Sequence, residues 1–245
     1  MRGGRGADVR TGFNGTMADI EDQFPSPSAP LPFPSADPSS SPDFSSSPDS
    51  FPASVELRGH GLRLRPWDPE SETDVETWLQ GLSDPGFRRW NTPVKLVETI
   101  EDARESMRLR AEWDAEGRSA SFCVTDEASG DVLGHIGVND IDDFLRIARV
   151  GYWVLPEARS RGVATRALRL AARHAFDELG VHRLELGHAL GHDASCRIGE
   201  RCGFRYEGTL RGAMFEAGRH DAFRDVHLHA RLATDPEPVT ATAAP

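Results

Sequence analysis

The segment from Gly151 to Ala167, GYWVLPEARSRGVATRA, constrains the fold more than any other part of the chain. The apolar and aromatic run Ile147–Leu155 is typical of a central β-strand, and an apolar stripe over Gly162–Leu179 predicts a long helix. Only a short turn separates the strand from the helix. The unpaired N–H groups at the start of that helix therefore lie beside Arg159 and Arg161, a combination suited to binding phosphate.

This turn does not fit the two best-known phosphate-binding motifs. A P-loop needs the lysine of G-x-x-x-x-G-K-S/T, and the turn has no lysine. A dinucleotide-binding fold needs the glycines of G-x-G-x-x-G, which are also missing. From the residues alone, two interpretations stay open: a phosphate-bearing ligand at the helix start, or a helix start with incidental arginines.

The remaining periodicities predict an α+β domain. Helices are expected from Asp68 to Leu79, over Glu98–Glu116 and over Ala194–Arg201, with a polar connection over Gly81–Pro93. The other expected strands are Leu62–Arg65, Ser119–Thr125, Val132–Val138, Arg183–Leu186, one from Phe204 onward, and Phe223–Ala230. The order β-α-α-β-β-β-α-β-α-β-β predicts a mixed, mostly antiparallel sheet flanked by helices.

Composition divides the chain into a domain and two tails. Residues 1–54 are expected to be a disordered tail, because proline and serine dominate the stretch from Glu21 to Ser54 and leave little apolar surface to bury. Residues 55–232 are expected to form the domain, and residues 233–245 a flexible C-terminal tail. We expect a cytoplasmic protein, because the sequence shows neither a signal peptide nor an apolar stretch of about 18 residues.

Charge and cysteine content exclude further classes. The formal net charge of −11 argues against a general nucleic-acid-binding protein, which needs a basic surface. The three cysteines Cys123, Cys196 and Cys202 cannot all pair, and none are in C-x-x-C spacing. Neither a disulfide framework nor a zinc site is expected from them, and no metal is expected.

Several motifs, taken in order, resemble the GNAT acyltransferase superfamily. Arg159-Ser-Arg-Gly162-Val-Ala164 is similar to its acetyl-CoA signature, Q/R-x-x-G-x-G/A. The stretches GYWVLPEARSRGVATRALRLAARHAFDELGVHRLEL and HDASCRIGERCGFRYEGTLRG resemble the branch that contains the ribosomal-protein-alanine N-acetyltransferases. The opening Gly61-Leu-Arg-Leu-Arg-Pro66 also fits this branch. The resemblance covers roughly residues 55–232 and implies a GNAT-like fold.

The resemblance also implies where acetyl-CoA, the co-substrate, is bound. The molecule would lie between two splayed strands, Gly151–Leu155 and Arg183–Ala189, and a backbone N–H of the first strand would polarise the thioester carbonyl. The residues implied to bind the pantetheine arm through their backbone are Trp153, Val154 and Leu155. Those implied to bind the pyrophosphate are Arg159, Arg161, Gly162, Val163, Ala164 and Thr165.

Two further positions of the branch are matched in the helix after the second splayed strand. Ser195 stands at the serine proposed as the general acid for the departing thiolate; the alternative is a serine that caps or opens the helix. Arg197 stands at an arginine that often approaches the cofactor or closes the helix.

The sequence departs from the branch at two positions. His192 replaces the asparagine of N-x-x-S, either as an altered contact to the pantetheine or as a catalytic group. Met214 stands where a general base is expected, and a thioether cannot accept the proton. The substitute candidates are Glu216 and the acidic residues Asp140, Asp142 and Asp143, for which surface turn carboxylates are the alternative interpretation. Cys196 is a poor nucleophile candidate because no base partner is evident in the sequence.

We therefore expect an N-acetyltransferase that transfers the acetyl group of acetyl-CoA to a primary amine by direct attack in a ternary complex. A weak base suits a protein N-terminal α-amine or a small amine of lowered pKa better than it suits lysine. The alternatives are a non-catalytic acyl-CoA-binding module and a transferase that uses another donor such as succinyl-CoA. The implied partners are acetyl-CoA and the amine acceptor; a homodimer is one state that the sequence allows, and neither nucleic acid nor membrane is expected.

Overall fold

The computed structural model describes residues 55–91 and 95–238. The expected disordered tail, residues 1–54, lies outside these ranges, as do residues 239–245 of the expected C-terminal tail. Residues 233–238 follow the last strand, and the Ala233 N–H donates a hydrogen bond to the carbonyl of His182. No helix within the described ranges has both the length and the apolar character needed to cross a membrane.

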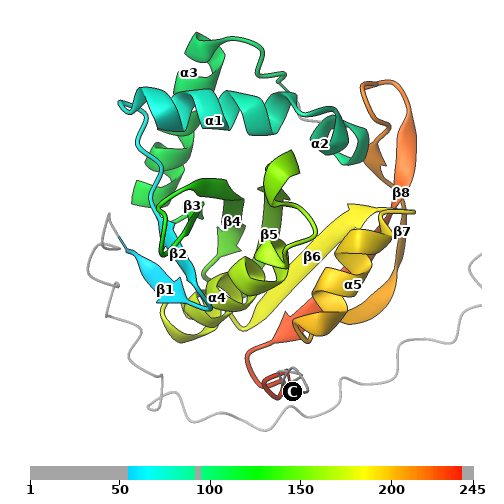
Figure 1. Ribbon diagram of the computed structural model, residues 1–245. Helices are drawn as coiled ribbons and strands as arrows, with labels where there is room; N and C mark the ends of the chain where they lie inside the picture. Colours follow the sequence, from blue (N-terminus) through cyan, green and yellow to red (C-terminus); the bar gives the residue numbers. More distant parts are fainter. Residues whose placement is uncertain (1–54, 92–94, 239–245) are drawn as a thin grey trace, which may run out of the picture. The chain divides into compact units, whose positions relative to one another are not determined.

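A single sheet forms the centre of the described fold, with strand order β1-β2-β3-β4-β5-β6-β8-β7 (Figure 1). Every neighbouring pair is antiparallel except β5 and β6, which are parallel. This is the mixed, mostly antiparallel sheet that the sequence predicts. The strands are β1 Leu57–Gly59, β2 Leu62–Arg65, β3 Ala120–Asp126, β4 Val132–Asp142, β5 Ile147–Val154, β6 Arg183–Ala189, β7 Arg205–Phe215 and β8 Phe223–Leu232.

Helices cover both faces of the middle of the sheet, since β3 and β4 are buried over consecutive residues rather than alternate ones. The predicted stripe of α4, which includes Ala167, Leu168, Ala171 and Ala175, is almost fully buried. Helix α5 lies against the part of the sheet formed by β6, β8 and β7 (Figure 1). The helices are α1 Glu72–Ser83, α2 Pro85–Trp90, α3 Ile100–Ala115, the 3-10 turn η1 Pro156–Ala158, α4 Val163–Asp177 and α5 Asp193–Arg201.

The sheet opens between β5 and β6. These strands pair only where Ile147–Arg149 faces Arg183–Glu185. Beyond that point β6 stays paired with β8, while β5 over Gly151–Val154 stays paired with β4 alone. The backbone edge of β5 that faces β6 is therefore free of strand partners over these residues, as expected for two splayed strands.

Three elements differ from the prediction at the N-terminal end of the domain. Helix α1 is capped by Ser71 rather than Asp68, because the Asp68 carboxylate accepts the Glu70 N–H in a turn before the helix. Helix α2 lies in the predicted polar connection and is capped by Asp84. Strand β1 was not predicted; it joins β2 through a turn at His60 and Gly61, both with positive φ.

Gly134 gives a sharp test of this packing, because its strand passes directly against β5. A Cβ at Gly134 would overlap the backbone carbonyl oxygen of Trp153, which cannot move without breaking the sheet. We expect Gly134→Ala to destabilise the protein by about 3 kcal/mol. Gly151→Ala is the matched control on the neighbouring strand, since its Cβ would meet nothing closer than the Asn139 Nδ2 atom at 3.9 Å. Urea unfolding measures the free energy of unfolding of both variants. Equal losses of stability in the two variants would contradict the prediction.

Candidate active site

A cavity of about 540 Å³ lies where the sheet opens, between α2, the end of β5, the turn into α4, and α5. Among the predicted site residues, it is lined by Trp153, Val154, Arg159, Gly162, Val163, Ala164, Thr165, His192, Ser195 and Arg197. These predicted residues come from two separate segments of the chain, and α2 adds a third segment to the lining. Two predicted residues do not line it: Leu155 is buried, with its N–H donated to the carbonyl of Leu133, and Arg161 is exposed.

The start of α4 leaves backbone N–H groups facing this cavity. Gly162 is the N-cap residue, with φ 72°, and no side chain caps the helix. The first hydrogen bond of the helix runs from the Arg166 N–H to the Gly162 carbonyl, so the preceding N–H groups have no partner within the helix. Ser160 also has a positive φ of 61°, so left-handed residues flank Arg161 on both sides, a backbone pattern from which anion-binding nests are built. The chemistry of this turn fits a pyrophosphate.

Arg159 is held by the protein itself. Its guanidinium pairs with the carboxylate of Asp84, and its Nε donates to the carbonyl of Val154 at 3.0 Å. Because Asp84 also caps α2, Arg159 fastens that helix to the turn before α4. Arg197 and Arg201 add positive charge to the cavity lining from α5.

Ser195 lies at the centre of a chain of hydrogen bonds. Its Oγ is 3.1 Å from the Tyr152 hydroxyl and 3.1 Å from Nδ1 of His192. Burial lowers the pKa of His192 to about 4, with the charges of His188 and Arg224 acting in the same direction. Burial raises the pKa of Tyr152 to about 12. At neutral pH the tyrosine keeps its proton and donates to Ser195, and the histidine is uncharged. In the histidine tautomer that carries its proton on Nε2, Nδ1 accepts the hydrogen bond of the Ser195 hydroxyl.

His192 is kept in place by an aromatic neighbour. Its ring stacks on Trp90, with centroids 4.7 Å apart and planes 9° apart. Sequence reasoning missed both Trp90 and Tyr152. The tyrosine stands in the quoted GYW strand, but only the path of β5 past α5 shows that its hydroxyl reaches Ser195. Trp90 ends the short helix α2, whose capping residues Asp84 and Pro85 were the available signal.

The carboxylates considered as substitute bases lie away from this cavity. None of Asp140, Asp142, Asp143 and Glu216 lines it. Asp140 pairs with Arg149 at 3.3 Å, and Asp142 accepts the Leu145 N–H at 2.8 Å. Met214 is half-buried, with its sulfur 3.7 Å from a guanidinium nitrogen of Arg224.

Cys196 does not line the cavity either. Its sulfur contacts the imidazoles of His188 and His227, which the sequence did not indicate. Burial raises the pKa of the Cys196 thiol, which is the opposite of what a nucleophilic cysteine needs.

The open sheet, with an uncapped helix start and a buried serine at its opening, has the architecture of an acyl-CoA-dependent N-acyltransferase. The family described as "Acetyltransferase (GNAT) domain" matches residues 61–205, more than half of the chain, and the protein belongs to this family. Acetyl-CoA is the co-substrate typical of the family, and the resemblance found in the sequence is confirmed.

The individual proteins that resemble this chain share only part of its sequence. The Escherichia coli (strain K12) ribosomal-protein-serine acetyltransferase is 27% identical over 158 residues, which are 64% of this chain and 80% of that protein. Bacillus subtilis (strain 168) YdaF is 34% identical over 91 residues, 37% of this chain and 50% of YdaF. The chain thus spans half the length of that relative. Mycobacterium smegmatis RimJ, solved in complex with CoA-disulfide, superposes with a TM-score of 0.64 at 24% identity, covering 76% of this chain and 88% of RimJ.

Proposed function

We propose that this acetyltransferase acts on the α-amino group of a protein N-terminus, by direct attack on acetyl-CoA in a ternary complex. One observation carries the proposal: of the described residues that line the cavity, none is aspartate or glutamate. A polyamine carries several positive charges and calls for carboxylates in its site. One relative is a ribosomal-protein-serine acetyltransferase, and its name supports a protein acceptor.

Without a carboxylate base among the described residues of the cavity lining, the site also selects among amines. At pH 7, reaching the neutral form costs about 1.4 kcal/mol for an α-amine of pKa near 8, but about 4.6 kcal/mol for a lysine amine of pKa near 10.4. An α-amine is therefore partly deprotonated before it binds. Its nitrogen can attack the thioester carbonyl and release a proton to water without a strong base.

The proposed roles of the site residues follow from their contacts. Backbone N–H groups at the start of α4 bind the pyrophosphate, and the free edge of β5 binds the pantetheine arm. As the C–N bond forms and the C–S bond breaks, Ser195 donates its hydroxyl proton to the departing thiolate. Tyr152 lies within hydrogen-bond distance to return a proton to Ser195, and because Tyr152 lines the cavity, its phenolate takes a proton back from water. His192 holds the serine hydroxyl before the thiolate departs.

Release of free CoA thiol tests the acceptor class. The full chain is assayed with a lysine-free peptide that has a free N-terminal serine or alanine, with an N-terminally acetylated peptide that contains one lysine, and with spermidine. We expect kcat/KM for the first peptide to exceed the other two by at least about tenfold, since the pKa difference alone favours it. Succinyl-CoA in parallel reactions tests the acyl donor. A higher kcat/KM for the lysine peptide or for spermidine would contradict the proposal. Failure of all three acceptors to cause release of CoA thiol would also contradict it.

A further inference from the structure

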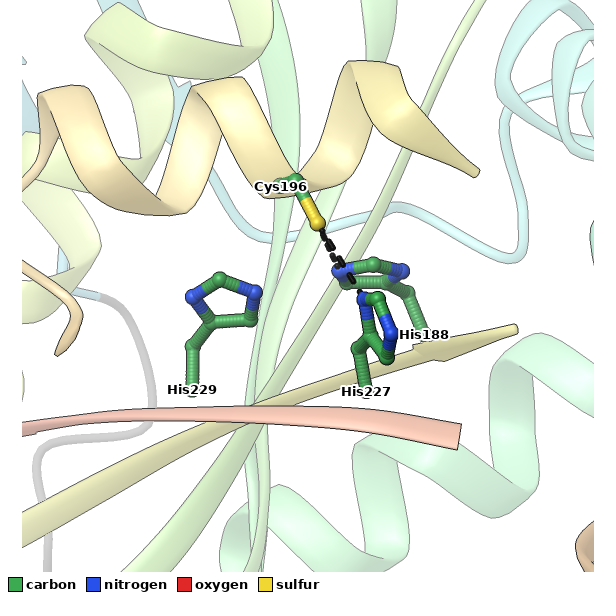
Figure 2. A group of neighbouring side chains, drawn as sticks. All are labelled: His188, Cys196, His227 and His229. Atoms are coloured by element: carbon green, nitrogen blue, oxygen red, sulfur yellow. Dashed lines mark hydrogen bonds between the residues drawn. The ribbon is translucent and has the colours of Figure 1, made fainter. Parts of the chain in front are cut away.

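Four potential metal ligands meet beneath α5, outside the cavity described above. His188 comes from β6, Cys196 from α5, and His227 and His229 from β8, and their side chains point toward one another (Figure 2). The four ligand atoms all lie within 4.8 Å of one another. The Cys196 sulfur is 3.3 Å from Nε2 of His188 and 3.4 Å from Nδ1 of His227.

The hydrogen bonds of two of these histidines point to a missing central partner. Nδ1 of His188 lies 3.1 Å from the carbonyl of Ala189 and donates to it, which leaves the Nε2 lone pair facing Cys196. Metal-bound histidines commonly use their second nitrogen in this way. His229 is 1% exposed, and neither of its ring nitrogens makes a hydrogen bond of good geometry with any described residue. One of the two nitrogens is near the Phe204 backbone carbonyl. The other is costly to bury without a partner, and a metal ion would satisfy it.

We propose that His188, Cys196, His227 and His229 bind one Zn²⁺ ion in a closed, structural site. Zinc takes one thiolate and three imidazoles in a tetrahedron, with bonds of about 2.3 Å to sulfur and about 2.0 Å to nitrogen. In such a tetrahedron the sulfur and each nitrogen are about 3.5 Å apart, close to the two observed sulfur–nitrogen distances. Magnesium and calcium prefer oxygen ligands, and this cluster has none.

The site would tie α5 to the sheet through residues that do not line the cavity. Cys196 directly follows Ser195, so an ion bound at Cys196 would hold the helix that carries the serine. Cysteine spacing in the sequence cannot reveal such a site, because three of its four ligands are histidines and the set comes from three elements. The expectation that the chain holds no metal rested on the cysteines alone. The proposal is independent of the acceptor proposed above.

The test measures metal binding to the full chain. The protein is prepared without an affinity tag and is first freed of bound metal with a chelator. After addition of Zn²⁺ and desalting, we expect one zinc per chain by elemental analysis. Titration with Co²⁺ is expected to give the thiolate-to-cobalt charge-transfer band of a tetrahedral site, and Zn²⁺ should displace it. Zinc is also expected to raise the Tm of the wild type in a concentration-dependent way.

Ligand variants and matched controls separate this site from adventitious binding. Cys196→Ser should eliminate the charge-transfer band, and His227→Ala, at a half-buried position, should weaken zinc binding by at least tenfold with the fold intact by circular dichroism. Cys202→Ser, at the end of the same helix, and His182→Ala, at an exposed position, should bind as the wild type does. Folded wild-type protein that binds no stoichiometric zinc, or binding retained in both ligand variants, would overturn the proposal.

Discussion

Gly162→Glu is expected to abolish binding of coenzyme A, with Kd raised at least about 100-fold, equivalent to about 2.7 kcal/mol. Gly162 is the N-cap of α4, and no atom of any described residue beyond its two chain neighbours lies within 4 Å of the position its Cβ would take. The glutamate therefore fits into space that is open at the edge of the cavity. Its carboxylate would compete for the N–H groups of the first turn and repel the pyrophosphate.

Gly180→Glu is the matched control, at the other end of the same helix. Gly180 also has a positive φ, 67° against 72° for Gly162, and open space around its Cβ position. Both variants carry the same backbone strain and the same added charge, but only Gly162 lines the cavity. Isothermal titration calorimetry measures the Kd for CoA of both variants, under conditions in which the same fraction of each is folded. Normal CoA binding by Gly162→Glu would show that the phosphates bind elsewhere.

Ser195→Ala is expected to lower kcat about 100-fold and to leave the Kd for CoA within about twofold of the wild type, as for loss of a general acid. Ser195 is 4% exposed and hydrogen-bonded on both sides, so its hydroxyl is oriented before the substrates bind. The alternative is a purely structural serine at the start of α5. In that case the variant would lose stability and keep its turnover per folded molecule.

Two neighbours of Ser195 extend this test. Tyr152→Phe removes the hydroxyl that donates to the serine, and we expect a smaller loss of kcat, about tenfold. His192→Asn restores the residue that the resembled branch carries, whose amide oxygen can accept from Ser195, so most activity should remain; His192→Ala should lose more. Steady-state kinetics with the preferred peptide measures all three. Full activity in Ser195→Ala would remove the serine from the reaction.

Most of the fold could be predicted from the chain, because its long elements carry strong periodic patterns. The α4 stripe and the apolar β5 strand were found nearly to the residue. The short elements were missed because they depend on caps and turns. Strand β1 has only three residues and needs the positive φ values of His60 and Gly61, and α2 is signalled only by Asp84 and Pro85.

The site was predictable where it is local in sequence and unpredictable where it is assembled by topology. The turn from Arg159 to Thr165 is one continuous motif, and the structure places most of it on the cavity. The ion pair between Arg159 and Asp84 joins positions 75 residues apart, and no motif spacing in the sequence predicts it. The contacts of Ser195 with Tyr152, and of Cys196 with three histidines, likewise exist only once β5, β6, β8 and α5 are in place.

The splay of β5 away from β6 also bears on how the chain avoids aggregation. Unpaired strand edges normally occur at the outside of a sheet, where they can recruit strands from other molecules. Here an unpaired edge over Gly151–Val154 lies in the interior of the sheet, with β6 continuing on the far side of the opening. Because β6 continues across the opening, a strand of a second molecule cannot extend the sheet here as it could at an outer edge. The protein thus keeps backbone hydrogen-bonding groups available for a ligand without offering them to its own copies.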